Sequence, residues 1–213
     1  MGTGIAKQFL PLGGIPLLAH TLLVFQQAPE IDEIIPILSP ADREYCLSDI
    51  IKAFRITKVR EIVDGGNERQ DSVSKGIGKL NVGTEIVLVH DGVRPFVTGN
   101  MIAECVKLAS KGECVTVGVP VKDTIKEVNE QGIVLRTLDR RLLWSIQTPQ
   151  AFPSDLLKQA HSAAIAGKHL GTDDAALVER AGHPVRVIRG SYDNIKVTTP
   201  EDLILAEEIL KRR

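Results

Sequence analysis

The chain has 213 residues, which suffices for one substantial hydrophobic core, and we expect a single domain spanning residues 1–213. Charged residues make up 25% of the sequence and the formal net charge is -1, so no global field attracts the chain to nucleic acid or to an anionic membrane. Its three scattered cysteines include no C-x-x-C pair, and no apolar run reaches the ~20 residues of a membrane span. We therefore expect a soluble protein of a reducing, cytoplasmic compartment.

Short β-branched runs alternate along the chain with longer segments of helical spacing. This alternation is typical of βα units and predicts an α/β fold with a mostly parallel sheet. Strands are predicted at 33–39, 59–63, 85–90 and 114–121, and helices at 15–27, 40–54, 71–80, 99–112 and from 200 onward. The strand at 85–90 reads as buried because its apolar character is continuous.

Two helix starts carry recognisable capping residues. Ser39 and Pro40 supply an N-cap and a first-turn proline for the helix at 40–54. Thr199 and Pro200 begin the last helix, and Asp202 is placed to complete a capping box with Thr199.

One segment interrupts the alternation. "TIKEVNEQGIVLRTL", residues 124–138, has two β-rich runs around a polar turn and is predicted to form a hairpin. Its faces are too polar for a central strand pair, so we expect an arm at about 121–142 that projects from the body. A lone two-stranded ribbon is marginal unless it packs on something, and a second copy of the chain is one such partner. A hairpin that folds back on its own domain is the alternative.

The stretch "EIVLVHDGVRPF", residues 85–96, places polar groups directly after the buried strand. Ligands of parallel α/β sheets bind outside the carboxyl ends of the strands, so Asp91 and Arg94 fall where chemistry is expected. An aspartate there suits magnesium, whose other ligands are phosphates, and an arginine suits a phosphate itself. The alternative is an Asp–Arg pair that only caps the loop. His90 is expected to support its neighbours or the core rather than to act as a base.

Other basic residues occupy similar loop settings. Singly they are typical of a solvated surface, but together they suggest a site for a polyanion. They are Lys7, Arg69, Arg140 and Lys196. Two glycines at 65–66 allow a close backbone approach to a ligand and place Ser72 near a helix start, where free N–H groups favour an anion.

The sequence does not contain the motifs that several classes of enzyme require. "KGIGKL" is an incomplete glycine pattern within a predicted helix, so a dinucleotide cofactor is not expected. No H-x-x-x-H or H-E-x-x-H pair indicates a zinc centre, and no G-x-S-x-G elbow offers an acyl-transfer nucleophile. Phosphoryl or nucleotidyl transfer remains as the candidate chemistry.

A set of segments spread over the whole chain carries a specific resemblance. The segments are, in order, "AKQF", "GGNERQDSV", "HDGVRPF", "PVKDTIK", "LDRRLLW", "QTPQAF", "GTDDAALVE" and "DNIKVTTPEDL". Together they resemble the 2-C-methyl-D-erythritol 4-phosphate cytidylyltransferases of the non-mevalonate isoprenoid pathway. Ribitol-5-phosphate cytidylyltransferases share several of them, but "PVKDTIK" with "LDRRLLW" is more similar to the erythritol family.

The resemblance implies a three-layer Rossmann-like nucleotidyltransferase fold in a homodimer whose arm reaches the partner's site. It implies that the phosphate of methylerythritol phosphate attacks the α-phosphorus of CTP with help from magnesium. The catalytic cations would be Lys7, Arg140 and Lys196, and Gly66, Arg69, Ser72 and Asp91 would bind the nucleotide. Asp91 would hold the metal, with Asp193 as a second candidate, and the sugar-alcohol phosphate would contact Arg94, Thr124, Arg140, Thr148, Thr172 and Lys196.

The opening residues depart from this family. Its members begin with a strand and a glycine-rich loop of the form A-A-G-x-G-x-R-M-G, whereas this chain starts at "MGTGIAKQF", as if at the last two letters. The absent segment would wrap the triphosphate and fill a central strand position. We expect a late or shortened start rather than an impaired protein, since losing an interior strand leaves its neighbours' backbone groups unpaired. A non-catalytic nucleotide-binding or dimerisation module is the alternative.

Overall fold

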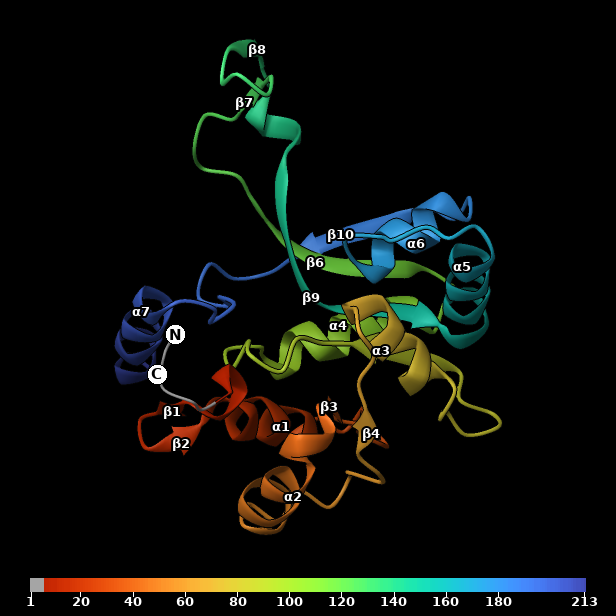
Figure 1. Cartoon of the computed structure of the whole chain (residues 1–213), viewed down its shortest axis with the longest axis vertical. Helices are drawn as coiled ribbons and strands as arrows, with labels where there is room; N and C mark the ends of the chain where they lie inside the picture. Colours follow the sequence, from red (N-terminus) through yellow and green to blue (C-terminus); the bar gives the residue numbers. More distant parts are fainter. Residues whose placement is uncertain (1–5) are drawn as a thin grey trace.

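The computed structural model describes residues 6–213, so the first five residues of the opening motif lie outside it. Strands and helices alternate around a central four-stranded sheet (Figure 1). The strands are β1 Pro11–Leu12, β2 Ile15–Pro16, β3 Ile37–Leu38, β4 Val63–Asp64, β5 Ile86–Val89, β6 Cys114–Pro120, β7 Lys126–Val128, β8 Val134–Thr137, β9 Trp144–Pro153 and β10 Val185–Arg189. The helices are α1 Leu17–Gln27, α2 Arg43–Tyr45, α3 Arg69–Ile77, α4 Gly99–Ala109, α5 Ser154–Ala166, α6 Asp174–Arg180 and α7 Pro200–Lys211, with shorter turns η1 Lys7–Phe9, η2 Pro40–Asp42, η3 Cys46–Lys52 and η4 Arg140–Leu142.

The central sheet is mixed, with the strand order β10-β6-β9-β5. β10 runs parallel to β6, but β9 lies antiparallel between β6 and β5. The predicted parallel arrangement is therefore wrong at β9. The reason is that β6 leads out to the hairpin and β9 returns from it, and an antiparallel return needs no crossover helix.

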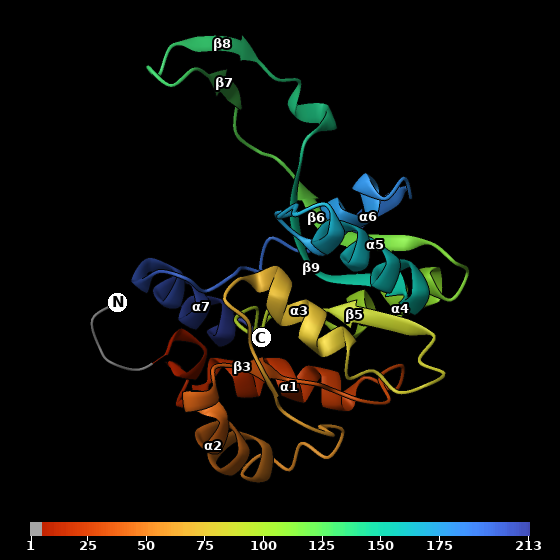
Figure 2. The same ribbon diagram turned by 45° about the vertical axis from the view of Figure 1, so that its right-hand side comes forward.

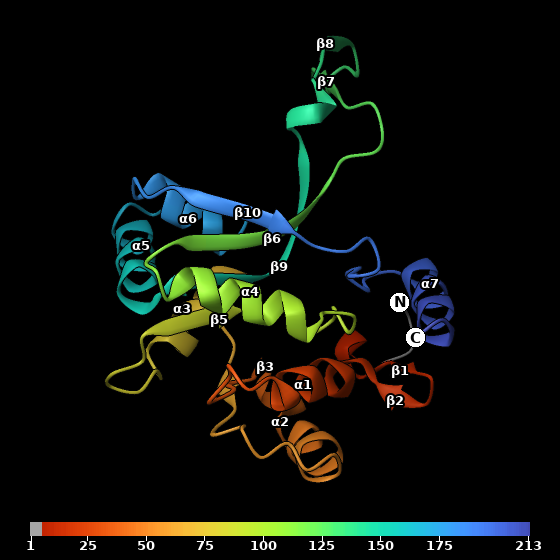
Figure 3. The same cartoon turned by 180° about the vertical axis from the view of Figure 1, so that it is seen from behind.

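Helices cover both faces of this sheet, because successive side chains of a strand point to opposite faces. On β6, Val115 and Val117 join a core cluster with Ile102 and Cys105 of α4. The next cluster lies on the other face and includes Phe152 of β9 with apolar residues of α5 and α6. Figure 3 shows α4 in front of the sheet, whereas in Figure 1 α5 and α6 are on the near side.

A second, smaller sheet pairs β3 with β4 in parallel beside α1 and α2. Within residues 6–213, β5 has β9 as its only paired neighbour, and β3 has only β4. β5 is consequently only partly buried along its whole length, so the prediction of a fully buried strand at 85–90 is wrong in degree.

The segment at 40–54 is helical but divided. It consists of η2, a single turn of α2 and the π-helical η3, and the Ser39 side chain makes no capping hydrogen bond. α3 begins at Arg69, two residues before the predicted start, because the Glu68 N–H donates to the side chain of Asp71 and closes the first turn. The predicted capping box of Thr199 and Asp202 at α7 is confirmed.

The predicted hairpin is confirmed as β7 paired with β8, on the two chain segments that leave β6 and lead into β9. It projects away from the sheet in both views (Figures 1 and 2). The turn is closed by Asn129, whose Oδ1 accepts from the N–H groups of Gln131 and Ile133, and by Gly132 at φ +79. A left-handed residue at this point favours glycine.

Within residues 6–213, no helix combines the length and the apolar character needed to cross a bilayer.

The central core should dominate stability. Phe152 of β9 is fully buried in the cluster with α5 and α6. Phe152→Ala should therefore lower the free energy of unfolding, measured by urea denaturation, by about 3 to 5 kcal/mol. The matched control is Ile204→Ala on α7, where the side chain is 66% exposed and the expected change is below about 0.5 kcal/mol. Equal losses at the two positions would contradict this placement of the core.

Candidate active site

The loop after β5 is a tight turn in which the Arg94 N–H donates to the Asp91 carbonyl at 3.0 Å. Thr148 on the neighbouring β9 fixes its start, since the Asp91 N–H donates to Thr148 Oγ1 at 3.0 Å. His90 fixes both ends, because its Nδ1 lies 3.0 Å from Thr148 Oγ1 and its Nε2 lies 3.3 Å from the Arg94 carbonyl. The turn is thus held by the side chains of Thr148 and His90 in addition to its own backbone hydrogen bond.

The surroundings of His90 select one protonation state. Burial lowers the pKa of His90 to about 4, and this outweighs the opposing effects of the Arg94 carbonyl and of Asp91. A neutral ring has one donor and one acceptor. We assign Nε2–H as the donor to the Arg94 carbonyl and Nδ1 as the acceptor from the Thr148 hydroxyl, which leaves both ring nitrogens satisfied. His90 supports the turn, as its predicted role requires.

Three cationic side chains surround the Asp91 carboxylate, one from the start of α3, one from the Asp91 turn itself and one from the segment after β10. Lys196 Nζ lies 3.1 Å from Oδ2, Arg94 Nε lies 3.4 Å from Oδ2, and Arg69 Nε lies 3.7 Å from Oδ1. The Asp91 side chain is 14% exposed, whereas those of Arg69 and Lys196 are 36% and 40% exposed. The carboxylate therefore lies at the base of the cluster, and two of its cations face solvent.

The charge balance of the cluster keeps Asp91 ionised. Burial acts to raise the pKa of Asp91, but Lys196, Arg69 and Arg94 together outweigh it, so the pKa lies below its ordinary value. Three positive charges against Asp91 and Asp174, the second carboxylate that Arg69 contacts, leave an excess of positive charge that a bound polyanion can neutralise. Because the formal net charge of the whole chain is only -1, this positive charge is local to the cluster.

The segment that carries Lys196 is held by buried polar contacts. Asn194 is completely buried, and its Nδ2 donates to the Thr148 carbonyl at 3.0 Å. Gln147 Nε2 donates to the Ser191 carbonyl at 2.8 Å. The Asn194 carbonyl accepts from Arg94 Nη1 at 2.9 Å, which joins this segment to the Asp91 turn. Sequence reasoning missed Asn194 and Gln147, although "DNIK" and "QTPQ" both belong to the motifs that it quoted.

The glycine pair at 65–66 forms the turn before α3. A Cβ on Gly66 would lie 2.3 Å from Asp71 Cβ, so no larger residue fits there without rearrangement. Ser72 Oγ accepts from the Gly66 N–H at 2.9 Å and lies 3.1 Å from the Glu68 carbonyl. The predicted nucleotide contact Ser72 thus holds the glycine turn in shape.

Gln70 links α3 to the loop that carries Thr172. Its side chain donates to the His169 carbonyl at 3.0 Å and accepts from the Gly171 N–H at 2.9 Å. Arg69 makes a second link, since its Nη1 lies 2.8 Å from Oδ2 of the buried Asp174. Neither Gln70 nor Asp174 was singled out in the sequence, and a conspicuous "TDD" was the only signal for the latter.

The remaining predicted residues lie outside this set of contacts. Lys7 is exposed on η1, which packs beside α1, and within residues 6–213 no hydrogen bond or ion pair joins it to Asp91. Thr124 and Arg140 are exposed at the base of the hairpin, where Arg140 Nη1 donates to the Lys122 carbonyl at 2.7 Å. Asp193 Oδ1 lies 3.7 Å from Nη2 of Arg212, the residue that follows α7. The roles of these four residues stay predictions.

The protein groups available to a metal ion are few. Within residues 6–213 no group of three or more histidine, cysteine or acidic side chains gathers as a metal site. The donor set therefore does not form an all-protein cage. Asp91 alone, facing three cations, fits an ion that shares most of its ligands with substrate phosphates and water, as magnesium commonly does.

Known proteins resemble this chain over its whole length. Residues 1–212 match the model of the family described as "IspD: 2-C-methyl-D-erythritol 4-phosphate cytidylyltransferase". A protein of Alkaliphilus metalliredigens (strain QYMF) with that enzyme name is 49% identical over 213 residues, which are 100% of this chain and 88% of that protein. One from Geobacillus kaustophilus (strain HTA426) is also 49% identical over 213 residues, with 100% and 92% coverage.

Solved structures of enzymes with these names also superpose on this chain. The crystal structure of 4-diphosphocytidyl-2C-methyl-D-erythritol synthase from Anaerococcus prevotii DSM 20548 superposes with a TM-score of 0.90 at 34% identity, covering 99% of this chain and 92% of that one. The 2-C-methyl-D-erythritol 4-phosphate cytidylyltransferase from Thermus thermophilus gives a TM-score of 0.81 at 31% identity, with 96% and 94% coverage.

The neutral state of His90 should make stability depend on pH. The folded-state pKa of about 4 is below the ordinary 6.5, so between these values the unfolded chain binds a proton that the folded chain does not. Stability should therefore fall as the pH falls from 6.5 toward 4. In His90→Gln this contribution is absent, so the melting-temperature gap between wild type and variant should narrow from pH 7.5 to pH 5. A gap that stays constant would show that His90 titrates normally.

Proposed function

The chain belongs to the 2-C-methyl-D-erythritol 4-phosphate cytidylyltransferase family, and we propose that its reaction takes place at the Asp91 cluster. In this reaction CMP is transferred from CTP to 2-C-methyl-D-erythritol 4-phosphate. The products are 4-diphosphocytidyl-2-C-methyl-D-erythritol and pyrophosphate. The observation that carries the proposal is the convergence of Lys196, Arg94 and Arg69 on one carboxylate from three parts of the chain. Ribitol phosphate, the other acceptor considered, is not the substrate named for these relatives.

The reaction needs charge stabilisation more than covalent help from the protein. A phosphate oxygen of the acceptor forms a bond to the α-phosphorus of CTP, the bond from that phosphorus to the bridging oxygen breaks, and its electron pair leaves with pyrophosphate. The attacking oxygen is already anionic, so no general base is needed. Negative charge builds on the α-phosphate and on the leaving group, and fixed cations lower the barrier by meeting that charge.

We assign roles to the cations according to their positions. Arg69 begins α3 directly after the glycine turn, so it lies where a helix N-terminus and a close backbone approach favour the nucleotide phosphates. Lys196 is the cation nearest to Asp91 and is 40% exposed, which suits contact with the acceptor phosphate. Arg94 is only 12% exposed and is anchored to the Asn194 carbonyl, which suits a fixed contact. Lys7, Thr148 and Thr172 keep the roles implied by the family resemblance.

Magnesium would be held on one side by Asp91 and on the other by the phosphates of CTP, with Asp193 as a second candidate ligand. The ion supplies positive charge to the triphosphate. The three cations that face Asp91 share that carboxylate, so the protein residues hold the site in shape before the substrates enter.

The hairpin supports a homodimer in which each arm serves the other copy. Its apolar side chains are exposed, including Ile133 at 63%, Leu135 at 60% and Leu142 at 79%, and apolar surface of this kind is typical of an interface. Thr124 and Arg140 lie at its base. We infer that they complete the acceptor site of the partner.

The three cysteines support a reducing compartment, and we propose that the enzyme is cytoplasmic. Cys46, Cys105 and Cys114 are all free and buried, and burial raises the pKa of each thiol. They fit structural positions rather than reactive ones.

Release of pyrophosphate tests the function directly. With CTP and magnesium we expect release in the presence of methylerythritol phosphate and far less with ribitol phosphate. Release with ribitol phosphate alone would reassign the acceptor. No release with either, from protein shown by its melting transition to be folded, would identify this chain as a non-catalytic member of the family.

Removal of the Asp91 charge tests the site. Asp91→Asn should reduce turnover by at least about 100-fold, because the cluster loses its only carboxylate among these contacts. The melting temperature should fall, because three cations lose the carboxylate that they share, but the variant should remain folded, since asparagine keeps the shape and Arg94 keeps its bond to the Asn194 carbonyl. Asp32→Asn, at an exposed acid, is the control and should be fully active. A fully active Asp91→Asn would remove Asp91 from the site.

Paired variants test the exchange of arms. Asp91→Asn and Arg140→Ala should each be inactive alone. In a heterodimer of the two, purified with a different tag on each subunit, one site combines an intact Asp91 with an intact Arg140 from the other subunit, so about half of the wild-type activity should return. If each arm served its own subunit, the heterodimer would stay inactive.

A further inference from the structure

The guanidinium of Arg69 lies between two carboxylates that differ in their surroundings. Asp91, on one side, belongs to the cluster described above. Asp174, on the other, is 1% exposed and lies closer, with its Oδ2 2.8 Å from Arg69 Nη1. The closer, buried partner is the one that can fix the direction of the arginine, because a short contact in a low dielectric is the stronger of the two.

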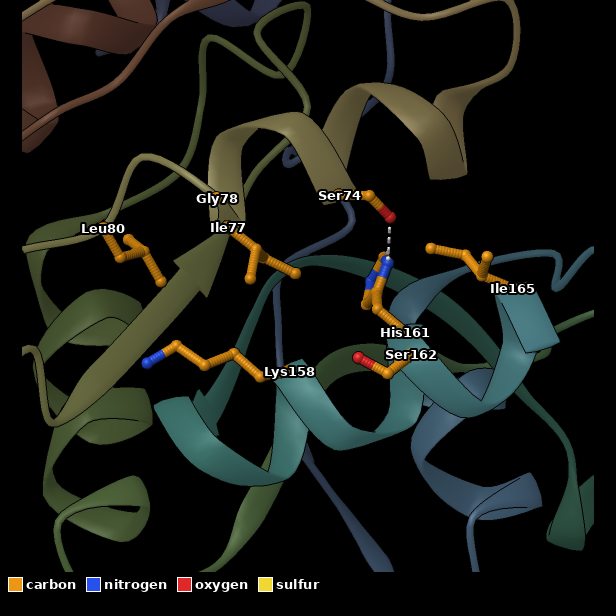
Figure 4. A pocket seen from close by; sticks show the side chains of 8 residues that line it. All are labelled: Ser74, Ile77, Gly78, Leu80, Lys158, His161, Ser162 and Ile165. Carbon is orange, nitrogen blue, oxygen red and sulfur yellow. Dashed lines mark hydrogen bonds between the residues drawn. The ribbon is translucent and has the colours of Figure 1, made fainter.

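Asp174 is itself held from behind. His161 on α5 lies with its Nε2 2.9 Å from Asp174 Oδ1, and its Nδ1 is 2.8 Å from Ser74 Oγ. His161 is 2% exposed, and Figure 4 shows its bond to Ser74 at the wall of a surface pocket. Ser74 and Arg69 both belong to α3, so the chain of contacts leaves α3 at Ser74 and returns to it at Arg69. We call these four residues the α3 circuit.

The order serine, histidine, aspartate also occurs in hydrolases, but the setting excludes that chemistry here. Ser74 lies in the interior of α3, where backbone N–H groups bond to the preceding turn and cannot form an oxyanion hole. The aspartate also faces Arg69, so its charge is directed to the cation at the other end of the circuit.

The burial of the circuit indicates a purpose beyond stability. Ionic groups in an interior are often no more stabilising than apolar residues of the same volume, because both charges lose their hydration. Asp174 Oδ2 accepts no aligned hydrogen bond within residues 6–213 and meets Arg69 as a charge. The contact is therefore an ion pair whose strength comes from its short distance and its burial, and the member of the circuit that reaches the surface of the site is Arg69, with a side chain 36% exposed.

We propose that Asp174, held by His161 and Ser74, is a positioning residue that aims the Arg69 guanidinium at the phosphates of CTP. This rests on the proposed function, in which Arg69 contacts the nucleotide. Asp174 does not touch the substrate. It holds the Arg69 guanidinium in a fixed position relative to α3, α5 and α6. CTP binding therefore does not have to order the arginine side chain.

The isosteric variant Asp174→Asn tests the proposal. It keeps the shape and an oxygen for His161 but removes the charge that holds Arg69, and kcat/KM for CTP should fall about 10-fold to 100-fold. The KM for methylerythritol phosphate should not change, whereas general loosening of the site would alter both. The control is Asp155→Asn, because Asp155 lies in the first turn of α5, the helix that carries His161, and its 87% exposed side chain faces Lys158 rather than Arg69. The control should retain CTP kinetics.

A double-mutant cycle distinguishes positioning from structural damage. If Asp174 acts only through Arg69, Asp174→Asn should have no further effect on kcat/KM for CTP once Arg69→Ala is present. An additional loss of the same size in the Arg69→Ala background would overturn the proposal. His161→Leu offers a second route if Asp174→Asn folds poorly: it should cause a smaller loss in the same parameter, again absent in the Arg69→Ala background.

The outcomes also separate this proposal from the proposed function. If Arg69→Ala itself retains wild-type CTP kinetics, the assignment of Arg69 to the nucleotide fails. If Arg69→Ala is impaired and Asp174→Asn is not, the site stands and only the positioning role is overturned.

Discussion

The attraction between one partly buried carboxylate and three cations organises this molecule. Asp91 and Arg94 lie in the turn after β5, Arg69 begins α3 and Lys196 lies beyond β10, so three separate parts of the chain meet at one point. Without the carboxylate the cations would repel one another. With it, they are held within reach of a polyanion, and the surrounding buried hydrogen bonds serve to keep that geometry in place before any ligand arrives.

Much of this follows from the sequence by local physics. A polar residue directly after an apolar strand must lie beyond the carboxyl end of that strand, and this predicted the positions of Asp91 and Arg94. Cap residues at Thr199 and Asp202, and the polar turn of the hairpin, depend on contacts between near neighbours in the chain, and both were predicted. The loop settings of Arg69 and Lys196 predicted a shared polyanion site, and the family resemblance added that this site includes Asp91.

The remaining features depend on distant partners. Strand β9 contains Pro149 and Pro153, and its direction is set by the hairpin that precedes it, so neither it nor the mixed sheet could be deduced from periodicity. Asn194 and Asp174 are polar residues that become buried because partners more than ten positions away satisfy them. A sequence shows which residues can form hydrogen bonds but not which of them will meet.

Strand β9 has a mechanical consequence. It leads from Trp144, where the hairpin joins it, past Thr148, which anchors the Asp91 turn, to Gln150, which is bonded to Asp173 at the start of α6. Its pairing with β6 shifts register at Thr148 and Pro149. It is also hydrogen-bonded along both edges, to β6 and to β5. A displacement of the hairpin therefore enters β9 through the part that is paired with β6 alone and meets the shift in register at Thr148, the residue that holds the Asp91 turn.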